Sequence, residues 1–402
     1  MNDSILGIET LVLNITQQCN MMCTYCFASC EAGAGTYGSP TFMTKEVALR
    51  AVDFLLHESK KEKVRIVFFG GEPLLNFKLI KEIVSYGNQQ SANLNKCIDY
   101  ELITNGTLLT RKIIDYLAEK KIIVQVSLDG PKDIHDEFRR FPNGQGTHAV
   151  IIANSEKMLA ICRDIISVRA TITKKGAKCF DTIKYLLDSG FEHINLTPVY
   201  TKNSDSNLNE EDIILVNEEF TKYADLYLSF ALEWKLLNDG LLTDILRFLR
   251  GARLDGGHRK EYFCGAGVSL FGISAEGGIF PCHAFVGFSE YQLGDLFSGI
   301  SQEKLRDYRA MIHVDRKSKC SSCWAKWMCG GGCAYQALIM NGDISVPYDI
   351  ICSYQKNIYR SAMRIYDQIY EKDPKIIDYL CSYRESKPLR EKLVSFLQGD
   401  GL

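Results

Sequence analysis

The sequence predicts an α/β protein that begins with six strand–helix units and continues into a cysteine-rich module. Between residues 11 and 199, six apolar runs alternate with amphipathic stretches, and most cysteines of the chain gather in two groups. Strand–helix units in series form a parallel sheet with right-handed crossovers, which is either doubly wound or curled into a partial barrel. Periodicity alone does not separate these two architectures.

The strands are predicted from nearly continuous apolar runs, as expected where both faces of a sheet are buried. The six expected strands are Leu11–Thr16, Val64–Phe69, Tyr100–Thr104, Ile122–Leu128, Ile166–Thr173 and His193–Val199. Helices are expected between them. Thr44–Glu58 has one apolar face behind Thr44 as N-cap, and Asp181–Ser189 ends at Gly190.

The second half of the chain has a different character. Asn209–Leu254 is predicted to be helical, whereas Glu261 to Cys352 is rich in glycine, cysteine and short turns. Metal clusters can stabilise a segment that buries so little apolar area. Tyr354–Tyr370 and Ile377–Leu397 are expected to be terminal helices. The expected parts are a strand–helix domain at 1–225, a helical linker at 226–262, the cysteine-rich module at 263–355 and C-terminal helices at 356–402.

The composition excludes several classes of protein. Apolar residues make up 46% and charged residues 24% of the chain, as in ordinary globular proteins. The net charge of -2 gives no reason to expect nucleic acid or an anionic membrane as a partner. Without a signal peptide or an apolar run of about 18 residues, a cytoplasmic location is expected. Fifteen cysteines there indicate metal binding or catalysis, because disulfides do not persist in the cytosol.

The first cysteine group lies on the loop after the first strand. Cys19, Cys23 and Cys26 are three soft thiolate ligands, which suit an iron–sulfur cluster or zinc. Three ligands leave one metal of a four-iron cluster open, and an open position is what a catalytic metal needs to bind a reactant. The alternative is a structural zinc site that a distant histidine or cysteine completes.

This C-x3-C-x2-C loop, with Tyr25 before its last cysteine, resembles that of the radical S-adenosylmethionine (SAM) superfamily. The resemblance implies a partial (β/α)6 barrel and a 4Fe–4S cluster on Cys19, Cys23 and Cys26. It also implies that SAM chelates the open iron and is cleaved to a 5′-deoxyadenosyl radical, which abstracts hydrogen from the substrate.

Glycine and polar residues recur at later strand ends, where ligands bind in parallel α/β folds. Each alone has an ordinary structural explanation, but their ordered recurrence favours the resemblance. By resemblance, the cofactor-binding candidates besides Tyr25 are Gly70, Gly71 and Glu72 near the SAM amino group, Thr104 and Asn105 after the third strand, Ser127 for the ribose, Asp129 beside it, Arg139 for SAM, Arg169 for its carboxylate, and Leu196 beside adenine.

The second cysteine group resembles the seven-cysteine SPASM extension of radical SAM enzymes, which holds two auxiliary 4Fe–4S clusters. By resemblance, Cys264, Cys282 and Cys333 hold the first, and Cys320, Cys323, Cys329 and Cys352 hold the second. A pair of zinc ribbons is disfavoured, because seven thiolates do not divide into two closed tetrahedral sites. The first cluster is one ligand short, so its fourth iron is open or is capped by His258 or another cysteine.

Two enzyme classes compete within this resemblance. Anaerobic sulfatase-maturating enzymes, which make formylglycine from Cys or Ser, place an aspartate after the Pro-Cys pair, where this chain has His283. The stretches PCHAFVG and CSSCWAKWMCGGGC resemble those of maturases that build thioether crosslinks in ribosomally made peptides, which is the predicted function. A non-enzymatic alternative is an iron–sulfur electron carrier, which would not need the strand–helix units or the SAM-contacting residues.

The predicted function implies particular partners. The substrate would be a cysteine-containing precursor peptide, and the electrons would come from a reductant such as a flavodoxin or ferredoxin. Because the catalytic loop begins at Cys19, no room is expected for an N-terminal leader-binding domain. A separate protein, or the surfaces of the barrel and the SPASM module, would then recognise a leader sequence.

Overall fold

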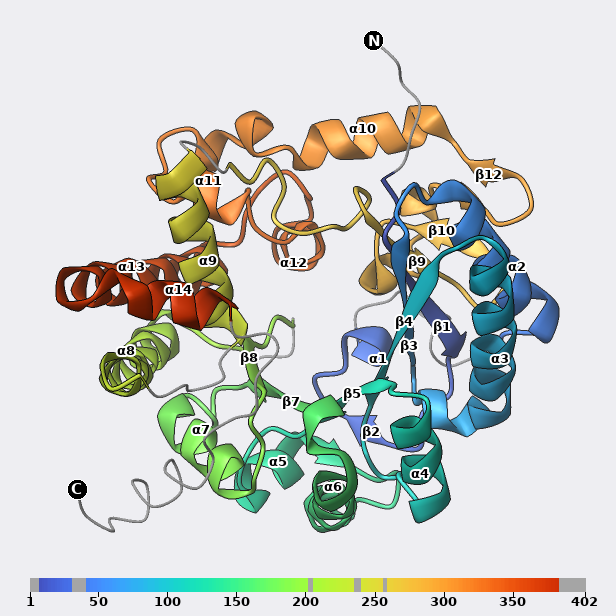
Figure 1. Ribbon diagram of the computed structural model, residues 1–402, viewed down its shortest axis with the longest axis horizontal. Coiled ribbons are helices and arrows are strands. Elements are labelled where there is room, and N and C mark those ends of the chain that lie inside the picture. The colour runs from blue at the N-terminus through green and yellow to red at the C-terminus, as the bar shows by residue number, and fades with distance from the viewer. Residues whose placement is uncertain (1–6, 31–40, 202–204, 235–239, 256–258, 383–402) are drawn as a thin grey trace.

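The computed structural model describes residues 7–30, 41–201, 205–234, 240–255 and 259–382. Its centre is a ten-stranded sheet (Figure 1). Six of its strands pair in parallel and in chain order, namely β1 (Thr10–Thr16), β3 (Lys63–Gly70), β4 (Cys97–Thr104), β5 (Ile123–Ser127), β7 (Ile166–Ile172) and β8 (Ile194–Pro198). They confirm the six predicted strands, with the largest difference at β4, which begins at Cys97 rather than Tyr100.

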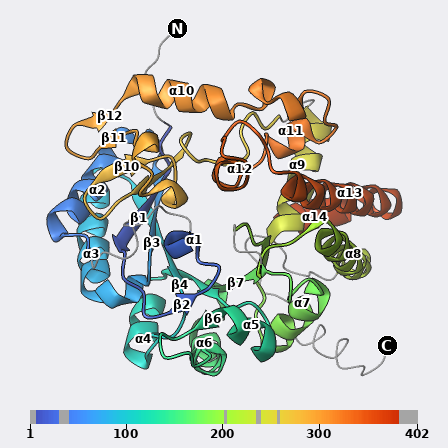
Figure 2. The ribbon, with the colours of Figure 1, turned by 180° about the vertical axis from the view of Figure 1, so that it is seen from behind.

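The order of these strands decides between the two predicted architectures. Because the order never reverses, every right-handed crossover puts its helix on the same face of the sheet. Figures 1 and 2 show these helices around the outside of a curved sheet, so the fold is a partial barrel and not a doubly wound sheet. The outer helices are α2 (Lys45–Glu58), α3 (Phe77–Asn93), α4 (Arg111–Glu119), α5 (Lys132–Phe138), α6 (His148–Cys162) and α7 (Cys179–Asp188).

Local sequence signals explain where these helices begin and end. The Thr44 hydroxyl accepts a hydrogen bond from the backbone N–H of Val47 at 3.3 Å, which confirms the predicted N-cap of α2. Beyond α7, Gly190 has a φ of 92°, a left-handed conformation that favours glycine. The buried face of α2 consists of Val47, Ala48, Ala51, Val52, Leu55 and Leu56, as its apolar spacing predicts.

The cysteine-rich segment continues the same sheet. Strand β9 (Leu270–Ile273) pairs in parallel with β1, and β10 (Gly278–Phe280), β11 (Gly294–Asp295) and β12 (Gly299–Ile300) extend the sheet with antiparallel pairs. The buried Asn14 side chain on β1 donates a hydrogen bond to the backbone oxygen of Ile273 at 3.3 Å. The barrel and the module therefore share backbone hydrogen bonds along one strand.

The remaining helices surround the module and the open side of the barrel (Figure 1). The predicted helical stretch from Asn209 to Leu254 contains two helices, and three further helices lie between residues 302 and 341, where none was predicted. The last predicted helix extends beyond the described residues, of which Ser382 is the final one. The helices are α8 (Glu210–Leu232), α9 (Gly240–Asp255), α10 (Gln302–Ile312), α11 (Lys326–Cys329), α12 (Ala334–Asn341), α13 (Asp349–Lys372) and α14 (Pro374–Ser382). Within these ranges, no helix has the length and apolar character needed to cross a membrane.

Candidate active site

The first cysteine group lies on a loop that a short two-stranded ladder holds in place. Cys19, Cys23 and Cys26 follow β1, and helix α1 (Phe27–Cys30) follows them. Strand β2 (Met22–Cys23) pairs with β6 (Arg139–Arg140), so that Cys23 lies opposite Arg139. The loop is thereby attached to the segment that follows α5, far away in the sequence.

The paired glycines at the end of β3 support the base of this loop. A Cβ atom at Gly71 would lie 2.1 Å from the backbone oxygen of Gln18, and one at Gly70 would lie 2.1 Å from that of Thr16. The backbone N–H of Gly71 donates to the Thr16 oxygen at 2.8 Å, and that of Glu72 donates to the Gln18 oxygen at 2.8 Å. The sequence suggested that glycine admits a ligand here. In the structure, the backbone that approaches these glycines is the cysteine loop itself.

Glu72 joins the ends of β3 and β4. Its carboxylate accepts hydrogen bonds from the Thr104 hydroxyl at 2.7 Å and from the backbone N–H of Asn105 at 2.7 Å. Burial raises the pKa of Glu72 to about 7, against the opposing effect of these donors. The Asn105 side chain donates to Asn20 at 2.8 Å and reaches the Cys19 sulfur at 3.8 Å. Glu72 and Asn105 thus connect the strand ends to the cysteine loop.

A second buried network holds the other side of the loop. Asp129 accepts hydrogen bonds from the Tyr25 hydroxyl, from Arg139 Nε at 2.9 Å and from the backbone N–H of Thr171 at 2.9 Å. Although burial acts to raise it, the Arg139 guanidinium holds the pKa of Asp129 below its ordinary range. Arg139 Nη1 also lies 3.9 Å from the Cys23 sulfur. Both carboxylate oxygens of Asp129 are therefore occupied by protein donors.

The surroundings of the thiols fit a group that is held by thiolates. Burial raises the pKa of Cys19 to about 11 and that of Cys23 to about 12. Each of these thiols therefore needs a bound cation in order to ionise at neutral pH. N–H donors point at the sulfur atoms: the backbone of Met21 reaches Cys19 at 3.4 Å, beside the contacts from Asn105 and Arg139. Donors of this kind commonly surround metal-bound sulfur. Cys19, Cys23 and Cys26 can therefore hold an iron–sulfur cluster here.

The other strand-end candidates lie on adjacent strands. Ser127 on β5 is the register partner of Arg169 on β7, and Leu196 on β8 is the partner of Ala170. Unlike Arg139, Arg169 has no ion-pair partner among the described residues, and it lines a cavity. Its guanidinium is therefore available to an anionic group, for which its planar donors are well suited.

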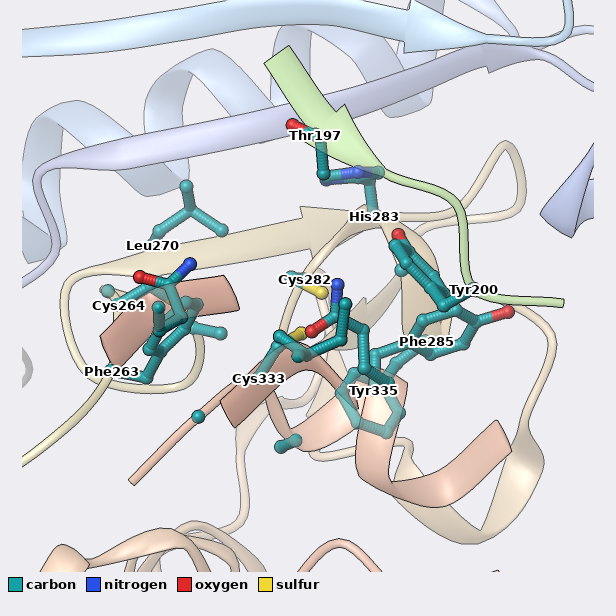
Figure 3. A pocket seen from close by; sticks show the side chains of 18 of the residues that line it. Thr197, Tyr200, Phe263, Cys264, Leu270, Cys282, His283, Phe285, Cys333 and Tyr335 are labelled. Atoms are coloured by element: carbon teal, nitrogen blue, oxygen red, sulfur yellow. The ribbon is translucent and has the colours of Figure 1, made fainter. Parts of the chain in front are cut away.

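This cavity has a volume of about 390 Å³ and lies between the last barrel strands and the cysteine-rich module. Cys264, Cys282 and Cys333 line it, and Figure 3 shows the sulfur atoms of Cys282 and Cys333 side by side. Tyr200 and Tyr335 form part of an aromatic wall, and the lining contains no aspartate or glutamate among the residues that the structure describes. Burial, followed by the effect of nearby Arg169, lowers the pKa of His283 in this wall to about 4.

The module separates its seven cysteines into two electrostatic groups. Burial raises the pKa of Cys264 to about 11 and raises that of Cys282, and each is raised further by Cys333. Burial also raises the pKa values of Cys320 and Cys352, with Cys329 as the next largest cause in both. Among the described residues, Cys264 and Cys282 therefore lie near Cys333, and Cys320 and Cys352 lie near Cys329, with Cys323 beside Cys320. Their assignment as two ligand sets stays a prediction. His258, a predicted alternative ligand, lies outside the described residues.

An aromatic cluster connects the cavity to the first cysteine loop. The Phe27 ring, directly after Cys26, lies with its centroid 6.0 Å from that of His283 and 5.9 Å from that of Tyr335. Phe69 at the end of β3 packs against His283, with ring centroids 4.4 Å apart. Phe27 therefore places the end of the cysteine loop against two residues of the cavity lining.

Sequence reasoning missed several residues of this region. Asn20 lies between predicted ligands, yet its amide bonds to Asn105 and donates to the Thr107 hydroxyl at 2.8 Å. Tyr200 and Tyr335 line the cavity from segments whose predicted site residues are Leu196 and Cys333. Only the position of Asn20 inside the cysteine loop was a usable signal, since isolated aromatic residues are usually part of a core.

Comparison with known proteins agrees with this geometry. A family model described as "Radical SAM superfamily" matches residues 13–210. An uncharacterized protein of Methanocaldococcus jannaschii is 30% identical over 267 residues, which cover 56% of this chain and 86% of that protein. A cysteine-type anaerobic sulfatase-maturating enzyme of Clostridium novyi is 24% identical over 343 residues, which cover 81% of this chain and 88% of that enzyme.

Solved structures extend the likeness to the cysteine-rich module. The structure titled "Native anSMEcpe with bound AdoMet and Cp18Cys peptide" superimposes with a TM-score of 0.74 at 20% sequence identity, and the match covers 90% of this chain and 99% of that one. The family match includes the C-x3-C-x2-C loop and the strand ends that surround it. This chain therefore belongs to the radical SAM superfamily.

Proposed function

We propose that this enzyme modifies a cysteine-containing, ribosomally made peptide by forming a thioether crosslink. The observation that carries the proposal is the cavity beside the barrel. Cys264, Cys282 and Cys333 of the module line it together with Arg169 and Leu196 of the strand region. A peptide in this cavity would contact both the proposed cofactor site and a set of thiols with no fourth protein ligand assigned.

The barrel residues would bind and orient the cofactor. Cys19, Cys23 and Cys26 would hold a 4Fe–4S cluster that, with SAM, supplies a 5′-deoxyadenosyl radical for hydrogen abstraction. Arg169 suits a carboxylate, because its guanidinium faces the cavity without an ion-pair partner among the described residues. Ser127, the register partner of Arg169, is the proposed contact for the ribose.

Other predicted cofactor contacts have partners within the protein. The Glu72 side chain accepts a hydrogen bond from Thr104. The Asp129 side chain accepts one from Tyr25 and forms an ion pair with Arg139. Their proposed role is to hold the cysteine loop and the strand ends in position for the cofactor. This role follows from their burial, because their polar atoms are already occupied.

Thioether formation sets definite requirements on the site. A substrate C–H bond and an S–H bond break and a C–S bond forms. One hydrogen atom leaves to the deoxyadenosyl radical, the thiol proton leaves to solvent, and one electron passes to an acceptor. The set of Cys264, Cys282 and Cys333 supports this chemistry, since a cluster with an open iron can bind the substrate thiolate and accept that electron.

A second candidate is the oxidation of Cys or Ser to formylglycine. The similarity to a sulfatase-maturating enzyme favours it. The described cavity lining argues against it, because it has His283 after Cys282 and no carboxylate that could serve as the base. The two reactions differ in whether the substrate keeps its sulfur.

Mass spectrometry of a co-expressed cysteine-rich peptide separates the candidates. A thioether product retains its sulfur, loses a pair of hydrogens and no longer reacts with a thiol alkylating agent. Formylglycine from cysteine loses the sulfur and reacts with a hydrazide. Production of 5′-deoxyadenosine without either product would contradict both candidates, and failure to cleave SAM would favour a simple electron carrier.

Spectroscopy tests the open iron directly. The cysteines of the first loop are replaced by alanine, so that only the auxiliary clusters contribute to the electron paramagnetic resonance signal. We expect the signal to change on saturation with the cysteine-containing peptide and not with the same peptide carrying serine. An unchanged signal would contradict an open iron that binds the substrate.

A further inference from the structure

Lys317 lies inside the cysteine-rich module. Its exposed fraction is 1%, and it is the only lysine among the described buried residues. It lies between the 3-10 turns Val314–Arg316 and Ser318–Cys320, where a lysine would ordinarily be exposed. A buried ammonium is costly unless opposite charges compensate it. The burial of Lys317 therefore requires a source of negative charge nearby.

Lys317 is hydrogen-bonded to Cys320 of one set and to Gly331, which lies between Cys329 of that set and Cys333 of the other. Its backbone oxygen accepts a hydrogen bond from the N–H of Cys320 at 2.9 Å. Its ammonium donates to the backbone oxygen of Gly331 at 2.8 Å, two residues before Cys333. A Cβ atom at Gly331 would lie 3.0 Å from Lys317 Cδ, so the glycine leaves room for the lysine stem.

Carboxylates do not account for this burial. Within the described residues, Lys317 forms no ion pair, and the carboxylate that senses its charge is the exposed Asp343. After the dominant effect of burial, which lowers its pKa, the groups that interact most with the ammonium are cysteines. They are Cys320, Cys329 and Cys352 of one set and Cys333 of the other, and Cys264 also senses the lysine.

We propose that Lys317 is the shared counter-cation of the two proposed auxiliary clusters and makes both of them easier to reduce. This inference rests on the proposed function, because it requires that the two cysteine sets hold clusters. Metal-bound thiolates would supply the negative charge that the buried ammonium needs. Reduction adds one more negative charge, which a cation in a poorly solvated interior stabilises strongly. Both clusters would then accept electrons more readily.

The experiment compares a variant that removes the charge of Lys317 with one that keeps it, and both retain a long side chain. Lys317→Met and Lys317→Arg are made in the full chain that also carries alanine at Cys19, Cys23 and Cys26, and both auxiliary potentials are measured by redox titration with paramagnetic resonance. For Lys317→Met we expect the reduction equilibrium of each cluster to fall about tenfold, which is 59 mV for one electron. Lys317→Arg is expected to stay near the parent. Lys319→Met, which removes an exposed lysine paired with Asp349, is the control and is expected to change neither potential.

Each outcome has a definite meaning. Full iron content with unchanged potentials in Lys317→Met, or a shift of one cluster alone, would overturn the shared role and leave the proposed function intact. Loss of iron in Lys317→Met but not in Lys317→Arg would support a need for the charge. Loss in both would overturn the proposal, because shape would then be decisive. A parent chain without auxiliary iron would instead refute the proposed function.

Discussion

Cys23 and Arg139 face each other across the ladder of β2 and β6, and Arg139 Nη1 also lies 3.9 Å from the Cys23 sulfur. Arg139 is in turn paired with Asp129, whose other oxygen accepts the backbone N–H of Thr171. The first cysteine loop is therefore held by a buried ion pair at the end of the barrel strands. Substitutions that break the ion pair between Asp129 and Arg139 should therefore also affect the position of the first cysteine loop.

Asp129→Asn should destabilise the protein by about 3 to 5 kcal/mol, because it leaves the buried Arg139 without its counter-charge. Thermal unfolding of the anaerobic protein measures the loss. Asp133→Asn on the exposed side of α5 is the control and should change stability little. Equal melting temperatures for the two variants would contradict a structural role of the ion pair.

The buried His135 should make stability depend on pH. Its Nδ1 accepts the backbone N–H of Asp129 at 3.2 Å, so Nε2 carries the proton and donates to the Thr147 hydroxyl. Burial lowers the pKa of His135 to about 4. Below about pH 6.5, His135 is therefore protonated in the unfolded chain but stays neutral in the folded chain. About 3 kcal/mol of folding stability is lost as the pH falls toward 4.

His135→Asn tests this dependence, since its amide oxygen can still accept from Asp129. When the pH is lowered from 7 to 4, we expect the melting temperature of the parent to fall further than that of this variant. Glu72 contributes in the opposite direction: because its pKa is raised to about 7, its contribution to the stability of the protein falls as the pH rises. This contribution is the same in the parent and in the variant, so it cancels in the comparison. Parallel curves would rule out His135 as the source. His57→Asn, at an exposed histidine, is the matched control.

Gly71→Ala should displace the first cysteine loop, because the new methyl group would meet the Gln18 backbone oxygen at 2.1 Å. We expect a stability loss of about 1 to 3 kcal/mol and a selective loss of the iron held by that loop. Iron content and thermal unfolding measure the two effects. Gly7→Ala, where no atom lies within 4 Å, should keep its iron. Parent-like iron in Gly71→Ala would show that the loop tolerates the change.

Removing cysteines from the two groups should separate chemistry from stability. The reconstituted chain should carry about twelve iron atoms, from three four-iron clusters, and alanine at Cys19, Cys23 and Cys26 should remove about a third of the iron and all SAM cleavage. Cys323→Ala should instead destabilise the module, because cluster binding and folding are coupled there, while SAM cleavage survives in part. The release of 5′-deoxyadenosine and the iron content of each variant test both statements. SAM cleavage by the triple variant would contradict the assignment of the catalytic loop.

The sequence by itself determined the strands of the barrel and the grouping of the cysteines. Buried parallel strands need continuous apolar runs, and a loop that binds a cluster needs thiols at short spacing, so both leave a local pattern. The same patterns placed Gly70, Glu72 and Asp129 at strand ends. They could not show that these residues contact the cysteine loop or polar groups of other strand ends, because such partners come from distant segments.

Only the tertiary structure decided the strand order, the cavity and the position of Lys317. The partial barrel follows from strand neighbours, which apolar periodicity does not encode. The cavity exists because β9 joins β1 and brings the module against β7 and β8. Lys317 carries no local signal of burial, since its surroundings come from two cysteine sets that are separated along the chain. Contacts between distant segments depend on how the whole chain packs, and a sequence pattern records only what neighbouring residues need.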